Sequence, residues 1–424
     1  MRGRRSKTGK SVIIAAFLTA LFAAANGWAQ SGQCDIERDV EARALDELTW
    51  KQLNRVYEDV GEEQYDSAYD DLQNMLRRAG RDTYLQAVLY QALAQVEWSR
   101  KNFDASLSHF EKSVELNTLP NQTHFALMYQ IAQLYFMQDR YDDALEALDL
   151  WFCAVPAETV TSHAWVLKAS INVQRENYRA ALEAIEKAIA MDDDPKESWY
   201  QVKLAAHFEL EQFPQAAATL ELMIERWPEK KSYWLQLSQI HYKLGNEDRA
   251  LAVLALAYRK GMLDKGADIL YLSSLYSNAD VPFKAAEVLD KGIRDGLVEP
   301  TKSHWTMVAE TWYNAEELER SLAAFVEAGR IAPDGDIDLR RGFILVDLER
   351  WADALEALNA ALEKGGLGDR RTAEAHLLRG MANFNLDRFD AASTDWGRAS
   401  RYEGTREAAR QWMNHLREER LRRS

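Results

Sequence analysis

The sequence predicts an all-α protein, a right-handed α-solenoid of about ten helical hairpins with a C-terminal capping helix. Three observations carry this prediction: a small residue returns every 33 to 38 positions, a bulky apolar residue follows it by four, and an aromatic residue often precedes it by three. A period of this length indicates stacked repeats rather than one globule with a single pocket. The small residues are Ala68, Ser106, Ala144, Ala181, Ala216, Ala250, Ala285, Ser321, Ala354 and Ala392. The bulky residues are Leu72, Phe110, Leu148, Ile185, Leu220, Leu254, Leu289, Phe325, Leu358 and Trp396. The aromatic residues are Tyr65, Phe103, Tyr141, Tyr178, Phe213, Trp351 and Phe389.

The third copy, residues 127–156, shows why each unit is a helical hairpin. One set of residues recurs at the spacing of a helical face: Met128, Ile131, Ala132 and Tyr135. After the polar break at 139–140 a second set has the same period: Tyr141, Ala144, Leu145, Leu148 and Phe152. So short a break makes the two helices antiparallel, and Pro156 ends the second. They pack closely where side chains are small, which explains Ala132 and Ala144.

The repeat is degenerate in places. Glycine stands in the expected turn only once, at Gly245. The sixth, seventh and eighth copies lack the aromatic residue and have Glu247, Pro282 and Leu318 instead. The hairpin boundaries predicted for these copies therefore rest on the small residue and the bulky apolar residue that follows it by four positions.

The N-terminal residues 1–29 are typical of a cleaved signal peptide. A head with five basic residues precedes an apolar run, Val12–Ala25, and Gly27 and Ala29 supply the small residues of a cleavage site. The run is short for a spanning helix, which needs roughly 20 apolar residues, although an uncleaved anchor is the alternative. We expect residues 30–46 to form a tail and the start of the first helix, 47–404 the repeat array, and 405–424 the capping helix and a basic tail.

The chain is acidic, with a net charge of −15, and removing the basic N-terminal segment would make it more negative. This excludes nucleic acid and anionic membrane surfaces as partners through general electrostatics. Basic or mixed-charge protein partners are favoured, although acidity also serves solubility. No other long apolar run occurs, so we expect no membrane insertion after cleavage.

The two cysteines, Cys34 and Cys153, leave two alternatives open. In an oxidising compartment they can pair, with the tail folding back over two or three repeats. Otherwise Cys153 is a buried thiol and Cys34 a free one.

The sequence shows no catalytic, metal-binding or cofactor-binding motif. The eight histidines are dispersed, and neither a nucleophile elbow nor a dinucleotide fingerprint is present. The glycine-rich run 364–368 follows a helix, so it predicts a helix cap and a turn between repeats. We therefore predict a protein that is not an enzyme and needs no cofactor or metal.

Helix geometry indicates the binding surface, because in stacked hairpins the first helices line the concave side. Glutamine and aromatic side chains there suit extended peptide segments, although such aromatics also pack within repeats. The candidate partner-binding residues are Gln95, Trp98, Tyr129, Gln133, Phe136, Gln201, Phe208, Gln239, Tyr242, Asn278, Glu310, Tyr313, Asn314, Phe384 and Asn385.

The third copy, with Pro228 and Pro333 ending later copies as Pro156 ends this one, resembles the tetratricopeptide repeat. Four stretches carry a closer resemblance: Gln130–Tyr135 running on to Trp151–Phe152, Glu197–Gln201, Lys230–Ser238 and Lys364–Leu367. In this order they are similar to the periplasmic tetratricopeptide proteins encoded beside TonB, ExbB and ExbD in Gram-negative bacteria. The resemblance covers roughly residues 57–416 and transfers no catalytic residue. The segment 34–50 departs most from it.

The resemblance implies a soluble periplasmic scaffold, peripheral to the inner membrane, that assists a TonB-ExbB-ExbD energy-transducing complex in uptake through outer-membrane receptors. Its expected partners are periplasmic segments of TonB or ExbD. The alternative is a scaffold for cell-envelope machinery that builds peptidoglycan or polysaccharide. An enzyme in its own right would need a metal or cofactor.

Overall fold

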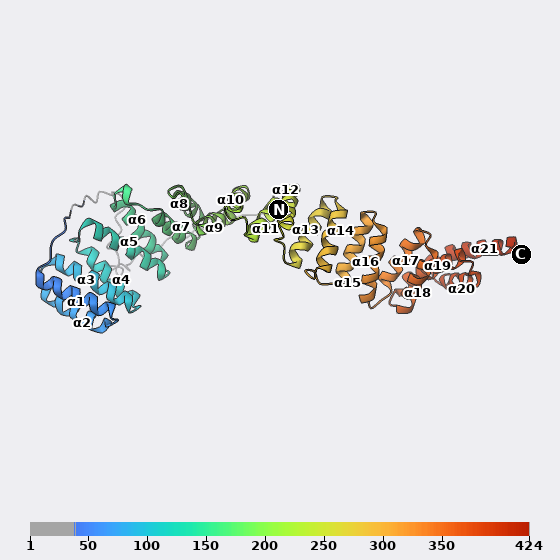
Figure 1. Ribbon diagram of the computed structural model, residues 1–424, viewed down its shortest axis with the longest axis horizontal. Helices are drawn as coiled ribbons and strands as arrows, with labels where there is room; N and C mark the ends of the chain where they lie inside the picture. The colour runs from blue at the N-terminus through green and yellow to red at the C-terminus, as the bar shows by residue number, and fades with distance from the viewer. Residues whose placement is uncertain (1–37, 39, 424) are drawn as a thin grey trace, which may run out of the picture. The chain divides into compact units, whose positions relative to one another are not determined.

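The computed structural model describes residues 38 and 40–423, which form 21 α-helices and two short 3-10 helices without a β-strand (Figure 1). The predicted signal peptide at 1–29, its cleavage site and Cys34 lie outside the described residues. Among the described residues, no helix combines the length and apolar character needed to span a bilayer. The all-α prediction is confirmed.

The chain divides into two compact units, one ending at Met191 and the other beginning at Asp192. The first unit holds four hairpins, formed by α1 (Glu47–Gly61), α2 (Tyr65–Ala79), α3 (Thr83–Ser99), α4 (Phe103–Glu115), α5 (Asn121–Met137), α6 (Tyr141–Ala154), α7 (Ser162–Gln174) and α8 (Tyr178–Ala190), with a 3-10 turn at Ala157–Thr159.

The second unit holds six hairpins and a final helix. Its helices are α9 (Glu197–Glu209), α10 (Phe213–Arg226), α11 (Lys231–Lys243), α12 (Glu247–Arg259), α13 (Gly266–Asn278), α14 (Pro282–Arg294), α15 (Lys302–Asn314), α16 (Leu318–Ile331), α17 (Asp336–Asp347), α18 (Trp351–Lys364), α19 (Gly368–Asn385), α20 (Phe389–Ala399) and α21 (Arg406–Arg423), with a 3-10 turn at Glu403–Thr405. Within each unit, each helix packs against the next one along the chain.

Every hairpin turns through one residue in the left-handed backbone region, five positions before the small residue of its repeat. Glycine occupies this position once, at Gly245, and acidic residues or Lys101 occupy it elsewhere. The residues are Glu63, Lys101, Asp139, Glu176, Glu211, Gly245, Asp280, Glu316, Glu349 and Asp387. The turn is therefore the same in all ten hairpins, including the three that lack the aromatic residue.

Small residues on both helices of a hairpin mark the points where the two helices pack closely. Gly380 of α19 shows this most clearly, because a Cβ added there would lie 2.3 Å from Nε1 of the buried Trp396 on α20. The indole fills the space that the missing side chain leaves, and its Nε1 donates a hydrogen bond to the carbonyl oxygen of Leu377. No larger residue fits at position 380 unless the two helices separate.

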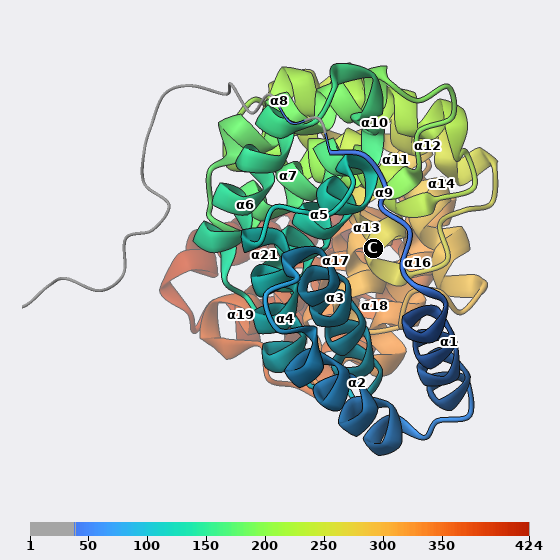
Figure 2. The same cartoon turned by 90° about the vertical axis from the view of Figure 1, so that its left-hand side faces the viewer.

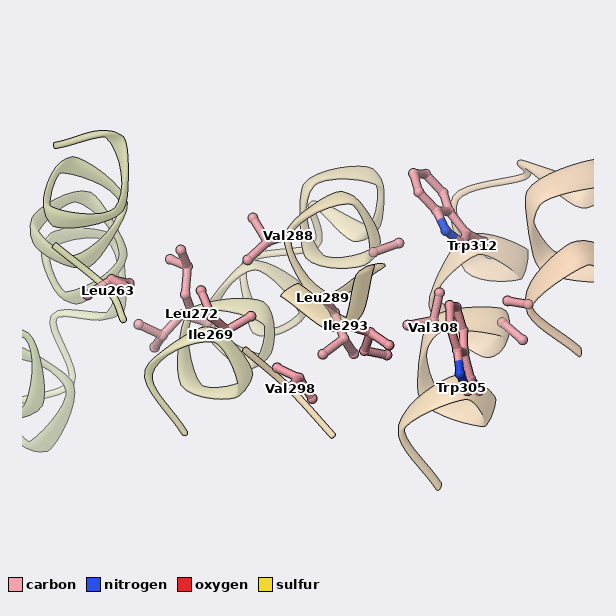
Figure 3. Close-up of a cluster of buried hydrophobic side chains, with 14 of the residues drawn as sticks. Leu263, Ile269, Leu272, Val288, Leu289, Ile293, Val298, Trp305, Val308 and Trp312 are labelled. Atoms are coloured by element: carbon pink, nitrogen blue, oxygen red, sulfur yellow. The ribbon is translucent and has the colours of Figure 1, made fainter. Parts of the chain in front are cut away.

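Hydrophobic side chains from successive hairpins form the interior of each unit. Figure 3 shows part of such a cluster in the second unit, where Leu272 of α13, Leu289 of α14 and Trp305 of α15 contribute to one buried group. Gly292 of α14 lets this group close, because a Cβ there would lie 2.6 Å from the Cγ2 atom of Ile269. The core thus runs from repeat to repeat, as stacked hairpins require.

The last helix closes the stack as predicted. Helix α21 packs on α19 and α20, and the ring of Trp412 stacks on that of Trp396 at 5.4 Å between centroids. The helix spans Arg406–Arg423, within the segment 405–424 that was expected to hold the capping helix and the basic tail. The glycine-rich run is the predicted cap: α18 ends at Lys364, and Gly365 has a φ of 68°.

An extended N-terminal strap, residues 38 and 40–46, crosses the ends of the early hairpins. It is the dark-blue trace that leads into α1 in Figure 2. The Asn121 side chain at the start of α5 donates to the carbonyl oxygen of Arg38 (2.6 Å) and accepts from the backbone N–H of Val40 (3.4 Å). Arg43 pairs with Asp82 through two hydrogen bonds of 3.2 and 2.9 Å. The strap thus contacts the beginnings of α3 and α5.

Cys153 near the end of α6 is half-buried and disulfide-bonded. The alternative of a free buried thiol at this position is therefore wrong. Cys34, the other cysteine of the chain, lies outside the described residues.

Candidate binding surface

We call the surface formed by the exposed side chains of α1, α3, α5 and the other first helices of each hairpin the first-helix face. None of the fifteen candidate residues is buried, and all lie on these helices. Four of them are half-buried aromatic residues: Tyr129, Phe136, Phe208 and Phe384. The other eleven are exposed, among them Trp98, Tyr242 and Tyr313 at 42%, 44% and 47%.

Two depressions on this face bring candidate residues together in the second unit. One lies between α9 and α11 and is lined by Gln201 and Phe208 together with Lys230 and Tyr233. The other lies between α15 and α17 and is lined by Glu310, Tyr313, Asn314, Arg340 and Phe343, among others. Each combines aromatic, amide and charged side chains, which suits an extended peptide segment.

The depression between α9 and α11 is organised around Glu197. This carboxylate accepts a hydrogen bond from the hydroxyl of Tyr233 and lies 3.5 Å from Nζ of Lys230. The Tyr233 hydrogen bond, with Lys230 beside it, holds the pKa of Glu197 below its usual value. The hydroxyl of Tyr233 also accepts from Nε2 of Gln201 at 3.1 Å. Gln201 is therefore held by neighbouring side chains rather than free to rotate.

The depression between α15 and α17 combines an ion pair with exposed aromatic rings. Arg340 of α17 forms an ion pair with Glu310 of α15, so the two first helices are joined across the depression. Beside this pair the rings of Tyr313 and Phe343 remain exposed, at 47% and 40%. Apolar rings next to a charged pair can hold both side chains and polar backbone groups of a bound segment.

Several candidate aromatic residues pack within their own hairpin. Each faces the aromatic residue that follows it by five positions, across the hairpin turn. The pairs are Trp98–Phe103 (5.3 Å between centroids), Phe136–Tyr141 (5.8 Å), Phe208–Phe213 (6.4 Å) and Phe384–Phe389 (5.6 Å). Tyr129 likewise lies 5.1 Å from the ring of Trp151 on α6. These rings stabilise the hairpins whether or not they also contact a partner.

Phe384 also packs against the C-terminal helix α21. Its ring lies 6.1 Å from Trp412 and 5.3 Å from His415, both on α21. The capping helix thus covers the position that repeat periodicity assigns to the binding face. Phe384 serves the cap, whereas its neighbour Asn385 stays exposed.

Sequence reasoning missed several residues that line the depressions, among them Phe343, Arg340 and Tyr233. Phe343 stands eleven positions before Ala354, the same offset that separates Gln239 from Ala250, so counting back from each small residue finds it. Arg340 and Tyr233 carry no such signal, because their roles depend on contacts with the preceding first helix.

The described residues contain no group of three or more histidine, cysteine, aspartate or glutamate side chains placed to hold a metal ion. The first-helix face presents exposed aromatic rings, amide groups and ion pairs in its two depressions.

Comparison with known families agrees with this architecture. A tetratricopeptide repeat model matches residues 91–152, 205–264 and 339–410, and a second tetratricopeptide repeat model matches residues 162–195. Together these matches span more than half of the chain, which therefore belongs to the tetratricopeptide-repeat family. The matches leave out α13 to α16, although the structure places two regular hairpins there.

Individual relatives are distant. Human crooked neck-like protein 1 is 27% identical over 100 residues, which cover 24% of this chain and only 12% of that protein. A tetratricopeptide repeat protein from Parabacteroides merdae is 13% identical, with 68% of this chain and 94% of that chain covered and a TM-score of 0.38. MamA from Desulfovibrio magneticus is 16% identical, with 44% and 99% covered and a TM-score of 0.37. The family assignment rests on the repeat models and not on these structural scores.

Proposed function

We propose that this chain is a non-catalytic scaffold that holds extended segments of partner proteins on its first-helix face. One observation carries the proposal: Tyr313 and Phe343 stand exposed in a depression beside the Glu310–Arg340 ion pair. Buried aromatic and arginine side chains dominate the energy of protein interfaces, so this depression is where a partner gains most.

The finer part of the proposal concerns the cell. The protein is exported, remains soluble in the periplasm and assists a TonB-ExbB-ExbD complex. Supporting this are the basic head and apolar run of residues 1–29 and the resemblance of stretches such as Gln130–Tyr135 and Lys230–Ser238 to tetratricopeptide proteins encoded beside these systems. The expected partners are periplasmic segments of TonB or ExbD.

Co-purification tests the partner. The full chain, tagged at its C-terminus, is recovered from detergent extracts together with TonB or ExbD. A variant with Tyr313→Ser and Phe343→Ser is expected to lose most of the captured partner at unchanged helicity. The control Glu183→Gln with Glu225→Gln changes exposed positions on second helices and is expected to capture as much as the wild type.

Two results contradict the proposal. Equal capture by the aromatic variant and the wild type would place the partner elsewhere on the surface. Recovery of enzymes that build peptidoglycan or polysaccharide, without TonB or ExbD, would favour the alternative scaffold role. Export is tested separately, since an intact mass beginning near Gln30 is expected for protein recovered from the periplasm.

A further inference from the structure

A groove in the first unit is formed mainly by the second helices α4 and α6, with residues of α5 between them. Its floor is apolar and includes Val114 of α4, Ile131 of α5 and Leu150 of α6. Met128 and Ala147 complete this floor. We call it the α4–α6 groove. None of the fifteen candidate binding residues lines it.

Acidic side chains surround the floor on both walls. Glu111 and Glu115 come from α4, and Asp143 and Glu146 come from α6. No lysine or arginine lines the groove. The groove therefore combines an apolar floor with negative charge on both of its walls.

The four acids differ in what they already bind. Glu111 accepts a hydrogen bond from the hydroxyl of Tyr135, and Asp143 pairs with Nε of Arg140 at 2.7 Å. Glu115 and Glu146 are exposed, and neither forms a hydrogen bond or ion pair with the described residues. One unpaired carboxylate thus stands on each wall, while Arg140 is occupied by Asp143 and by the face of the Tyr135 ring, 4.4 Å away.

A corresponding groove in the second unit shows that this charge is not a general property of the repeats. The groove over α14, α15 and α16 is also lined by acids, but bases stand among them. Lys291 pairs with Asp295, and Arg294 pairs with Asp290 at 2.9 Å. Its charges are balanced internally, whereas those of the α4–α6 groove are not.

We propose that the α4–α6 groove docks a basic amphipathic segment of a partner protein. The segment places an apolar side chain on Val114, Ile131 and Leu150, and flanking lysine or arginine side chains meet Glu115 on one wall and Glu146 on the other. Charge complementarity selects this occupant. An acidic or neutral segment would cover the carboxylates of Glu115 and Glu146 without pairing them, and covering an unpaired charge costs binding free energy. The proposal rests on the scaffold function and adds a second docking surface to it.

Titration of the full chain with a defined probe tests the groove. The probe is a fluorescein-labelled peptide of lysine and leucine with leucines at i, i+3, i+4 and i+7. We expect Glu115→Gln with Glu146→Gln to weaken binding about tenfold or more, because two charge-assisted contacts are lost. The control variant Glu183→Gln with Glu225→Gln removes the same charge from exposed positions outside the groove and is expected to bind like the wild type. A peptide with serine in place of leucine is expected not to bind.

Three outcomes overturn the proposal. Equal weakening by both double variants would mean attraction to the overall negative charge. Equal binding of the serine peptide would mean that the apolar floor is not used. Concentration-dependent self-association that disappears in the Glu115/Glu146 variant would identify the occupant as a second copy of this chain. Because the probe contains no TonB-system sequence, failure here leaves the co-purification result standing, and the reverse also holds.

Discussion

The side chain of Ser238 on α11 donates a 2.8 Å hydrogen bond to the carbonyl oxygen of Ala250 on α12, and neither residue is exposed to solvent. The same hydrogen bond, between residues twelve positions apart, joins Ser273 to the carbonyl oxygen of Ala285. In the hairpin of α15 and α16 the serine lies on the second helix instead, where Ser321 donates to the carbonyl oxygen of Ala309. The small residues on the two helices of a hairpin are thus the two sides of one close contact.

This contact predicts a graded response to substitution at Ser238. Replacement by alanine removes one hydrogen bond and keeps the close approach, so the free energy of unfolding should fall by about 1 kcal/mol. Replacement by leucine forces α11 and α12 apart and should cost roughly 1–3 kcal/mol more. Urea unfolding followed by circular dichroism measures both values. An equal effect of the two substitutions would show that the approach is not tight.

The left-handed turn residues predict opposite effects at two equivalent positions. Glu211 has a φ of 54°, a conformation that costs a non-glycine residue about 1 kcal/mol, so Glu211→Gly should raise the stability of the second unit by a few tenths to 1 kcal/mol. Gly245→Ala should lower it by a similar amount, because nothing lies within 4 Å of an added Cβ and only the backbone is strained. Both variants are compared by urea unfolding. Stabilisation by both substitutions, or by neither, would contradict the account.

The ten hairpins could be predicted from the sequence because their determinants are local. Each depends on a small residue, a bulky residue four positions later and a polar break, and these signals survive even where the aromatic residue is missing. The hairpin of α13 and α14 therefore forms although Pro282 stands where the aromatic residue is expected, since Ala285 and Leu289 keep the close contact.

The remaining features depend on contacts between distant residues. The strap requires Asn121 to meet residues 38 and 40, and no local pattern announces that pairing. The coverage of Phe384 by α21 is likewise invisible in its own repeat. The α4–α6 groove arises from how α4 and α6 pack around α5. In the sequence its acidic residues are charges on separate helices, and nothing indicates that they line one groove.

The buried carboxylate of Asp395 predicts a large loss when it is removed. Burial alone would raise the pKa of Asp395, but hydrogen bonds from His376 (3.1 Å) and Arg379 (2.5 and 2.9 Å) outweigh burial and hold that pKa below its usual value. Asp395→Ala leaves the largely buried Arg379 guanidinium without its carboxylate partner, and loss of the charged partner of a buried pair typically costs about 3–5 kcal/mol. The double variant with Arg379→Met should recover part of this loss. Urea unfolding of both variants checks the prediction, and an additive loss would contradict it.

The strap predicts a local change without global unfolding. Asn121→Ala removes the side chain that binds Arg38 and Val40, so the strap should become accessible to protease while the helices keep their stability. Limited trypsin digestion should cleave after Arg43 several times faster than in the wild type. Gln122→Ala, an exposed neighbour, is the control. Cleavage at unchanged rate would show that the other contacts hold the strap without Asn121. These are the contacts of Arg38 with Asn117 and Leu119 and those of Arg43 with Asp82 and Tyr84.

His124 predicts a loss of stability in mild acid. Its ring is buried in α5, its Nδ1 atom has no hydrogen-bond partner, and burial, with the charge of Arg38 as a smaller cause, lowers its pKa from 6.5 to about 4. Between these two values the unfolded chain binds a proton at this ring and the folded chain does not. The folded state therefore loses stability as the pH falls from about 6.5 toward 4, by at most about 3 kcal/mol.

The substitution His124→Phe isolates this effect, because phenylalanine fills a similar space and does not titrate. Wild type and variant should have similar free energies of unfolding at pH 7.5, since the buried Nδ1 gains no hydrogen bond there. At pH 4.5 the wild type should be the less stable of the two, and hydrogen exchange should place the difference in α5 and its neighbours, because repeats couple mainly to adjacent repeats. Acid-sensitive carboxylates such as Asp395 affect both proteins equally and cancel in the comparison. A difference between the two proteins that stays constant from pH 7.5 to 4.5 would mean that the ring is protonated as readily in the folded chain as in the unfolded one.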